Sequence, residues 1–169
     1  FIDSPAIVSS PPLRTDLDTI LASNGYARLR DGFTHAVRDV LGAHLEEHAD
    51  PGLTVYRRGV DGTLDLPAVL IANPSVSEFD VQPCGVDRWV WPIHVGVART
   101  GMDELATQAE LQKRMAEVVG LLRQLLDENP YLGAADVANA RLTSAEFGTS
   151  FAVQGQAFPA YEITIEIDG

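Results

Sequence analysis

The sequence predicts an α+β fold in which a largely antiparallel sheet carries two main helices packed on one face, plus an extended N-terminal arm. Three observations lead to this prediction. Two long segments repeat apolar residues at helical spacing, several shorter segments alternate apolar and polar residues, and the order along the chain is helix, strands, long helix, strands. That order is typical of helices gathered on one side of an antiparallel sheet.

The first 28 residues are predicted to form the arm, and residues 29–169 a single α+β domain. Residues 1–12 hold three prolines and three serines among apolar residues, which favours an extended segment that packs on another surface. Leu13–Ser23 has the pattern of a short helix ended by Asn24-Gly25, since both residues tolerate a positive φ. The apolar Phe1 and Ile2 either dock on the same chain or reach onto a neighbouring subunit.

The first main helix is predicted to begin at about Leu29 and to end at Asp50-Pro51-Gly52. Its apolar residues fall on one stripe, while charged residues lie off it. The stripe consists of Phe33, Val37, Val40, Leu41, His44 and Leu45.

Three segments after this helix are predicted to be strands. Leu53–Arg58 is β-prone and is followed by a turn at Val60–Thr63. Leu66–Ala72 is short and almost wholly apolar, which predicts a central strand covered on both sides. Arg88–Ala98 alternates, and its proline, Pro92, predicts an edge or a bulge because proline cannot donate to a ladder.

The two tryptophans of the alternating strand share one face with Ile93, Val95 and Val97. Trp89 and Trp91 are predicted to belong to the core, because tryptophan buries a large area. An aromatic platform for stacking bases is the alternative, but only Arg88 and Arg99 lie nearby to contact phosphates.

The second main helix is predicted to open at Asp103-Glu104, with acids at its positive end, and to end at Asn129-Pro130. Its predicted apolar stripe consists of Leu105, Ala109, Met115, Val118, Val119, Leu122, Leu125 and Leu126. Arg141–Phe147 and Phe151–Gln156 are predicted as two weaker strands. Tyr161–Ile167 alternates cleanly and predicts a strand with one apolar and one polar face.

Composition and charge exclude several classes of function. Twenty-four acidic against twelve basic residues give a net charge of −12, which repels nucleic acid phosphates. This disfavours a grip on DNA, although an acidic wall past which DNA slides is compatible. Cys84 is the single cysteine, so no disulfide or multi-cysteine zinc site can form within the chain. The sequence shows no membrane span and no secretory signal, and it predicts synthesis in a cytoplasm.

One short motif resembles a catalytic metal site. His44, Glu47 and His48 match the HxxEH order of inverted zinc peptidases, in which Glu47 would be the general base. A packed or partly exposed histidine pair at an acidic helix end is the preferred interpretation, because His44 continues the apolar stripe. Cys84 and His94 lack the surroundings of a nucleophile, and no phosphate-binding glycine loop occurs. We therefore expect no catalytic, metal or cofactor residues and no enzyme activity.

The order of these segments resembles that of the tail terminator (minor tail protein U-like) family of long-tailed bacteriophages, over about Leu29 to Ile167. The resemblance rests on the order of six segments: RDGFTHAVRDVLGAHL, LPAVLIA, RWVWPIHVGVA, a long helix, NPYLGAA and AYEITIEI. It implies a virion protein, made in the host cytoplasm, that forms a ring, expected to be a hexamer, on the end of the tail tube. The implied partners are further copies of the chain, the tail tube protein and the head-tail connector, and DNA would pass through the ring without specific binding. The N-terminal extension departs from the compact form of the family.

Other functions compatible with the sequence are a head-tail adaptor or tail-completion protein of the neck, a zinc-dependent hydrolase using the HxxEH motif, and an acidic cellular binding module. For a ring, the predicted contact residues are Phe1 and Ile2 of the arm, the pair Arg57 and Arg58, and Glu78, Asp80 and Asp87 in a predicted acidic loop from Glu78 to Asp87. Arginines and acids of neighbouring subunits could pair, but exposed pairs contribute only about 0 to 1 kcal/mol each. Apolar burial would then have to carry the assembly.

Overall fold

A computed structural model describes residues 25–60, 64–82, 85–99, 103–133, 136–153 and 156–169. The chain divides into two compact units, Phe1–His35 and Ala36–Gly169. The second unit holds six strands and most of the helical residues, so the α+β prediction is confirmed. Phe1, Ile2, the predicted helix Leu13–Ser23, Cys84 and most of the turn at Val60–Thr63 lie outside the described residues.

Helix α2 (Gly25–His48) begins in the first unit and ends in the second. It starts four residues before the predicted Leu29, so Gly25 is itself helical. The predicted stripe is confirmed, since Val37, Leu41, His44 and Leu45 are buried. The chain leaves the helix as predicted, where the Asp50 carboxylate accepts the N–H of Gly52 at 2.8 Å.

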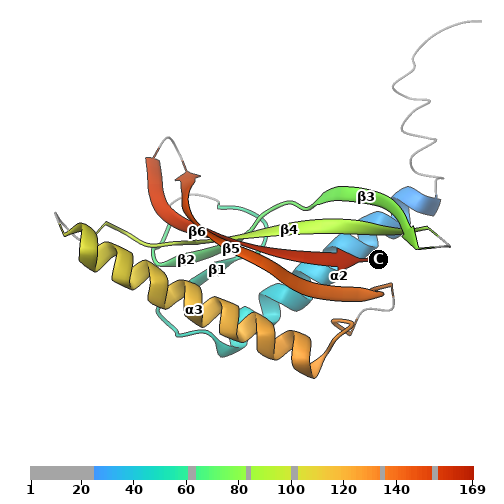
Figure 1. The fold of residues 1–169 in the computed structure, drawn as a ribbon, viewed down its shortest axis with the longest axis horizontal. Helices are drawn as coiled ribbons and strands as arrows, with labels where there is room; N and C mark the ends of the chain where they lie inside the picture. Colours follow the sequence, from blue (N-terminus) through green and yellow to red (C-terminus); the bar gives the residue numbers. More distant parts are fainter. Residues whose placement is uncertain (1–24, 61–63, 83–84, 100–102, 134–135, 154–155) are drawn as a thin grey trace, which may run out of the picture. The chain divides into compact units, whose positions relative to one another are not determined.

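The sheet has the strand order β1-β2-β4-β6-β5, and β3 pairs with the first part of β4 (Figure 1). Its strands are β1 (Thr54–Tyr56), β2 (Ala68–Ile71), β3 (Ser75–Gln82), β4 (Val86–Gly96), β5 (Asn139–Val153) and β6 (Gln156–Asp168). Only the short pair β1 and β2 runs parallel among the described strands; the other pairs are antiparallel. β2 is an inner strand as predicted, but β4 and β6 occupy the middle of the sheet.

Alternation along β4 and β6 builds the core. Trp91, Ile93 and Val95 on β4 are fully buried, as are Ile163, Ile165 and Ile167 on β6. Trp89 is only 8% exposed, so the prediction that both tryptophans belong to the core is confirmed. The face that carries these residues is the helix-covered face of the sheet, because Val97 and Tyr161 pack with Leu111 of α3.

Pro92 lies in an inner strand, so the prediction of an edge or a bulge is wrong. It pairs with Thr164 of β6 on one side. On the other side its carbonyl accepts the N–H of Ala72 at 3.0 Å, at the position where β2 has ended and β3 has not begun. The nitrogen of a strand residue points to the same side as its carbonyl, so the missing donor of Pro92 faces a break between two neighbouring strands.

Helix α3 (Glu104–Glu128) has the predicted ends but a different buried stripe. The buried residues include Thr107 and Leu111, whereas the predicted Leu105 is 79% exposed and Ala109 is exposed. Thr107 can be buried because its hydroxyl donates to the carbonyl of Asp103 at 3.0 Å. Val118, Leu122 and Leu125 keep the predicted register in the second half of the helix.

The N-terminal cap of α3 gives a first testable prediction. The Asp103 carboxylate accepts the N–H of Ala106 at 3.0 Å, which satisfies one of the free donors of the first turn. We expect Asp103→Ala to lower the free energy of unfolding by about 1 kcal/mol. Urea unfolding followed by circular dichroism measures this loss, and Asp103→Asn, which keeps the acceptor, should retain most of the stability. Equal losses in both variants would contradict the cap.

The C-terminal half of the sheet also differs from the prediction. The two weaker strands predicted at Arg141–Phe147 and Phe151–Gln156 form the single strand β5, and Gln156 already belongs to β6. A register shift between Phe147 and Thr149 accommodates Gly148, whose φ is +97°. The glycine that interrupts the apolar pattern therefore marks a bulge and not a strand end.

Two polar contacts join the helices within the second unit. The Nε2 atom of His44 lies 2.9 Å from the carbonyl oxygen of Leu121. The guanidinium of Arg114 bonds Glu110 and Glu117 of its own helix, while the N–H of Asp50 donates to Glu117 at 2.7 Å. Desolvation lowers the pKa of Arg114, but its hydrogen bonds to the two glutamates outweigh this effect and leave the pKa raised.

No described helix is long and apolar enough to cross a membrane.

Candidate assembly surfaces

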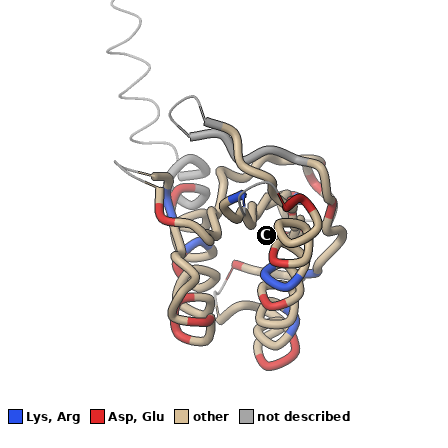
Figure 2. The backbone as a smooth tube through the Cα atoms, turned by 90° about the vertical axis from the view of Figure 1, so that its left-hand side faces the viewer, with Lys and Arg blue, Asp and Glu red and all other residues tan. Residues whose placement is uncertain are grey.

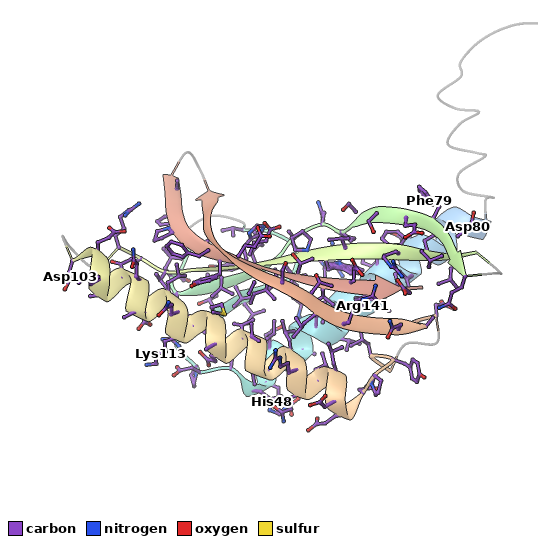
Figure 3. All side chains as sticks on the ribbon, viewed as in Figure 1. His48, Phe79, Asp80, Asp103, Lys113 and Arg141 are labelled. Atoms are coloured by element: carbon purple, nitrogen blue, oxygen red, sulfur yellow. The ribbon has the colours of Figure 1, made fainter. Side chains whose placement is uncertain are left out.

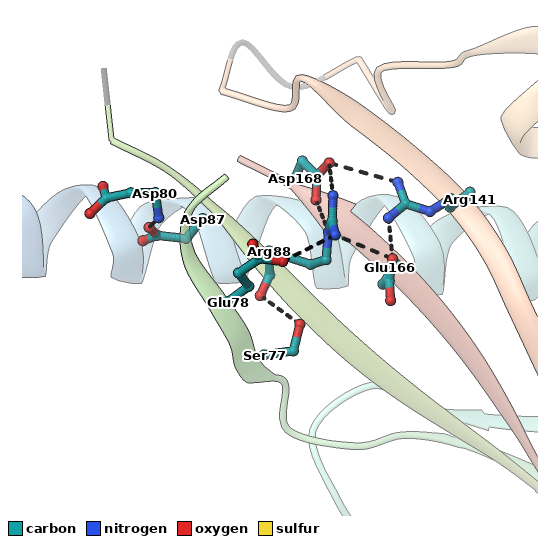
Figure 4. A network of polar contacts seen from close by, with 8 residues as sticks. All are labelled: Ser77, Glu78, Asp80, Asp87, Arg88, Arg141, Glu166 and Asp168. Atoms are coloured by element: carbon teal, nitrogen blue, oxygen red, sulfur yellow. Dashed lines mark hydrogen bonds and ion pairs between the residues drawn. The ribbon is translucent and has the colours of Figure 1, made fainter. Parts of the chain in front are cut away.

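The strongest polar cluster lies where β3, β4, β5 and β6 run side by side (Figure 4). Arg88 of β4 bonds the two carboxylate oxygens of Asp168 at 3.0 and 3.4 Å, and its Nη1 lies 3.3 Å from Glu78 of β3. Arg141 of β5 bonds Glu166, and its Nη1 lies 3.7 Å from Asp168. The register explains the cluster, because Arg88 faces Asp168 and Arg141 faces Glu166 across neighbouring strands.

The arginines of this cluster pair with carboxylates of the same chain. The hydrogen bond from Arg88 to Asp168, with the nearby Glu166 and Glu78, raises the pKa of Arg88 above its usual value despite some desolvation. The side chain of Asp168 is only 4% exposed, and both guanidinium groups lie close to its carboxylate. Two arginines thus hold three carboxylates within one chain.

The acidic segment predicted as a loop has a different structure. Glu78 and Asp80 lie on strand β3, and Asp87 lies on β4, so the loop from Glu78 to Asp87 is a hairpin instead. Asp87 is buried, and its carboxylate accepts the N–H of Asp80 at 3.1 Å. Asp80 has a φ of +54°, which places it at an irregularity of the pairing between Glu78 and Gln82. The sequence offers little alternation there to reveal the strand.

The basic pair has acidic partners in its own chain. Arg57 Nε lies 2.5 Å from Glu46 Oε2, and its Nη1 lies 3.5 Å from Asp39. Arg58 lies 3.7 Å from the same Asp39. Gly42 makes the approach possible, since a Cβ there would lie 2.6 Å from the Arg57 side chain. The arginines therefore fasten β1 and the residues after it to α2, and a role of Arg57 and Arg58 between subunits stays a prediction.

The histidines of the HxxEH motif are placed as a packed pair. The rings of His44 and His48 lie 4.6 Å apart, and His48 lies 3.9 Å from Glu47. Because a carbonyl oxygen can only accept, the contact with Leu121 puts a proton on Nε2 of His44. The described residues contain no group of three or more side chains arranged to hold a metal ion.

A groove runs between α3 and the edge strand β5. One cavity of about 160 Å³ is lined by Val119 and Arg123 of α3, by residues 142–145 of β5 and by Ile163. A second cavity of about 540 Å³ continues it along Leu126, Asp127 and residues 140–142. Arg123 contributes to both cavities. The lining mixes apolar and polar groups: the smaller cavity is somewhat more apolar and the larger one is more polar, and the charges of Arg123, Asp127 and Arg141 lie along it.

Four large apolar side chains of the described residues are exposed. Phe79 on β3 is 65% exposed and lies beside Asp80 (Figure 3). Tyr131 after α3 and Phe147 on β5 are more than half exposed, as is Leu105.

Sequence reasoning missed the groove and most of these exposed residues. The groove lies where α3 and the edge strand β5 come together in the fold, and no local pattern carries that information. One signal was present in the sequence: residues 147–161 form its longest stretch without a charged side chain. Elsewhere charged residues interrupt the sequence more often, and Figure 2 shows acidic residues along α3.

Comparisons of this chain with known proteins do not assign a role to these surfaces. No protein-family model matches the chain, and no curated protein does. Among solved structures, the bacteriophage SPP1 gp17 protein is similar with a TM-score of 0.44 and 16% sequence identity, over 79% of this chain and 88% of that chain. At that level of similarity, the function has to be argued from the residues of this chain.

Proposed function

We propose that this chain is a structural protein of the bacteriophage neck that forms a ring on the end of the tail tube. The ring would stop the polymerisation of the tube and offer a surface to which the head attaches. The proposal starts from the resemblance of the sequence to tail terminators. It is supported by the way the segments behind that resemblance occur as α2, β2, β4, α3 and β6 around one sheet.

One observation carries the proposal: the charged side chains of the described clusters are paired within the chain, while apolar surface is left open. Arg88, Arg141 and Arg57 each have carboxylate partners. In contrast, the groove beside β5 and the exposed Phe79 and Phe147 have apolar surface available for another protein. This distribution favours assembly through apolar contacts over chemistry on a small molecule.

The acidic charge agrees with a channel through which DNA passes. A net charge of −12 on each subunit would keep the duplex from binding by phosphate contacts. The proposed partners are further copies of the chain, the tail tube protein and the head-tail connector.

A head-tail adaptor is the second candidate, because such a protein is also small, oligomeric and inert. The two candidates differ in which partner they bind first. A zinc hydrolase built on His44, Glu47 and His48 has less support, since His44 donates to a backbone carbonyl and α2 ends at His48.

Native mass measured with and without tail tubes tests the proposal. We expect a species of about six times 18.2 kDa, formed alone or on the tube ends, because the resemblance implies a hexamer. Light scattering and native mass spectrometry over a concentration series measure it, and tubes capped by the protein should stop growing. Sedimentation with purified portal-bearing heads, and not with tubes, would indicate the adaptor. A monomer that binds neither would contradict both neck functions.

A further inference from the structure

The β5–β6 hairpin continues past the rest of the sheet as a two-stranded ribbon, here defined as residues 149–153 and 156–158. The pairing of β6 with β4 ends at Ala160, and the last contact toward β4 is that of the Val97 N–H with the Pro159 carbonyl at 3.3 Å. Beyond this point the described part of β6 pairs with β5 alone, as in Phe151↔Phe158 and Ala152↔Ala157. Figure 1 shows the ribbon rising away from β4 and β2.

This ribbon is unusual in its composition. It lies inside residues 147–161, which carry no charge in a chain of net charge −12. At its base Phe147 is 55% exposed, and Ala157 within it is exposed. An isolated two-stranded hairpin is only marginally stable in water, and beyond Ala160 this ribbon has no third described strand beside it. The ribbon therefore has the properties of a segment that packs on a protein.

The groove between α3 and β5 offers a matching surface. Val119 and Leu142 contribute half-buried apolar surface to it and Leu126 and Ala140 extend this surface, while Ile163 is fully buried. The charges along the groove are Arg123, Arg141 and Asp127, so the groove is locally not acidic. Among the described strands, β5 has β6 as its only neighbour, which leaves this side of the sheet open.

The ribbon of a molecule cannot enter its own groove. The groove uses residues 140–145 of β5, and the ribbon begins farther along the same strand and continues away from them. The occupant must therefore come from another molecule. Two copies that each carry a charge of −12 repel each other, and the ribbon, which lies in the longest uncharged stretch of the sequence, can approach a second copy at low electrostatic cost.

We propose that the ribbon of one copy docks in the α3–β5 groove of the next copy. Ribbon and groove are different surfaces, so the contact is heterologous, and its repetition generates either a closed ring or an open filament. This inference rests on the proposed function, because the ribbon–groove contact would join neighbouring subunits of the proposed ring. Both surfaces lie in α3, β5 and β6, so the contact does not require the N-terminal arm.

Pairs of single-cysteine variants test the contact. In a Cys84→Ser background, Ala157→Cys labels the ribbon and Ala145→Cys labels the groove; both alanines are exposed, so the fold should tolerate the changes. The two proteins are mixed with tail tubes present and treated with a short bifunctional thiol reagent. We expect a covalent dimer of about twice 18.2 kDa in the mixture and little in either protein alone. Ser77→Cys on β3 replaces the groove variant as the matched control, and should not give this dimer.

The outcomes separate this inference from the proposed function, because native mass is recorded on the same samples. A six-fold species without the Ala157–Ala145 product would overturn the ribbon contact and leave the ring standing. Protection of the Ala145→Cys thiol by tubes, again without the product, would assign the groove to the tube protein and overturn the inference. The product in an assembly that is not six-fold would support the contact and contradict the hexamer.

Discussion

Replacement of Trp91 by alanine is expected to lower the free energy of unfolding by about 4 kcal/mol, the largest effect of any single change considered for this chain. Trp91 is completely buried on the helix-covered face of β4. It pairs with Ile165 of β6, and the neighbouring residues Ile163 and Ile167 of β6 face the same side. Removal of the indole leaves a cavity in the middle of the sheet that the flanking isoleucines cannot fill. Urea unfolding monitored by far-ultraviolet circular dichroism measures the loss.

Two variants make this prediction specific. Trp91→Phe keeps part of the volume and should cost clearly less than the alanine variant. Tyr131→Ala removes an aromatic side chain that is 59% exposed, and should change the stability by less than about 0.5 kcal/mol. A loss below 1 kcal/mol for Trp91→Ala would show that the strand does not face the core, and would reopen the aromatic platform as an interpretation of the two tryptophans.

The second large effect is expected for Asp168→Asn, which should lower the free energy of unfolding by about 2 kcal/mol. The carboxylate is nearly buried and accepts from Arg88 at 3.0 and 3.4 Å, with Arg141 also nearby at 3.7 Å. An asparagine keeps the shape but turns an amide donor toward two guanidinium groups. Unfolding in urea at neutral pH measures the difference.

The matched control for the second prediction is Glu78→Gln. Glu78 contacts the same Arg88 at 3.3 Å, but its side chain is 58% exposed, so the loss should stay within about 1 kcal/mol. The effect of Asp168→Asn should also depend less on added salt, because a shielded pair is screened less than an exposed one. Equal losses for the two variants would mean that the cluster is a solvated surface network and that burial of Asp168 contributes nothing.

Both effects bear on assembly as well as on folding. The Arg88 cluster joins β3, β4, β5 and β6, and Trp91 pairs with Ile165 of β6, the strand whose first residues belong to the ribbon. A variant that unfolds cannot report on a ring. Assembly experiments are therefore better made with surface changes such as those at Ala157 and Ala145, which leave the core and the cluster intact.

Much of the fold was predictable from local patterns. The stripe from Val37 to Leu45, the alternation of β4 and β6, and the ends of α3 at Asp103 and Asn129 all appear in the structure as the sequence indicates. These features depend on the spacing of apolar residues and on caps, which act within a few residues of chain. The exclusion of Trp89 and Trp91 from the surface follows from the same alternation.

Other predictions failed where distant parts of the chain decide the outcome. Pro92 is tolerated in an inner strand because β2 ends and β3 begins opposite it. The joining of two predicted strands into β5 depends on thirteen residue pairs with β6. The exposure of Leu105 depends on the angle at which α3 crosses the sheet, and the hairpin from Glu78 to Asp87 depends on its pairing to β4. None of these conditions is a local property.

The sequence alone therefore determined the class of fold, the two main helices, the core strands and the acidic character that disfavours a grip on nucleic acid. Only the tertiary structure decided which charged residues pair, such as Arg57 with Glu46 of α2 and Arg88 with Asp168. The groove between α3 and β5 likewise depends on the tertiary structure. The physical reason is the range of the interactions. Periodicity and capping act between near neighbours along the chain, whereas ion pairs, edge strands and grooves arise from segments brought together by the packing of the helices on the sheet.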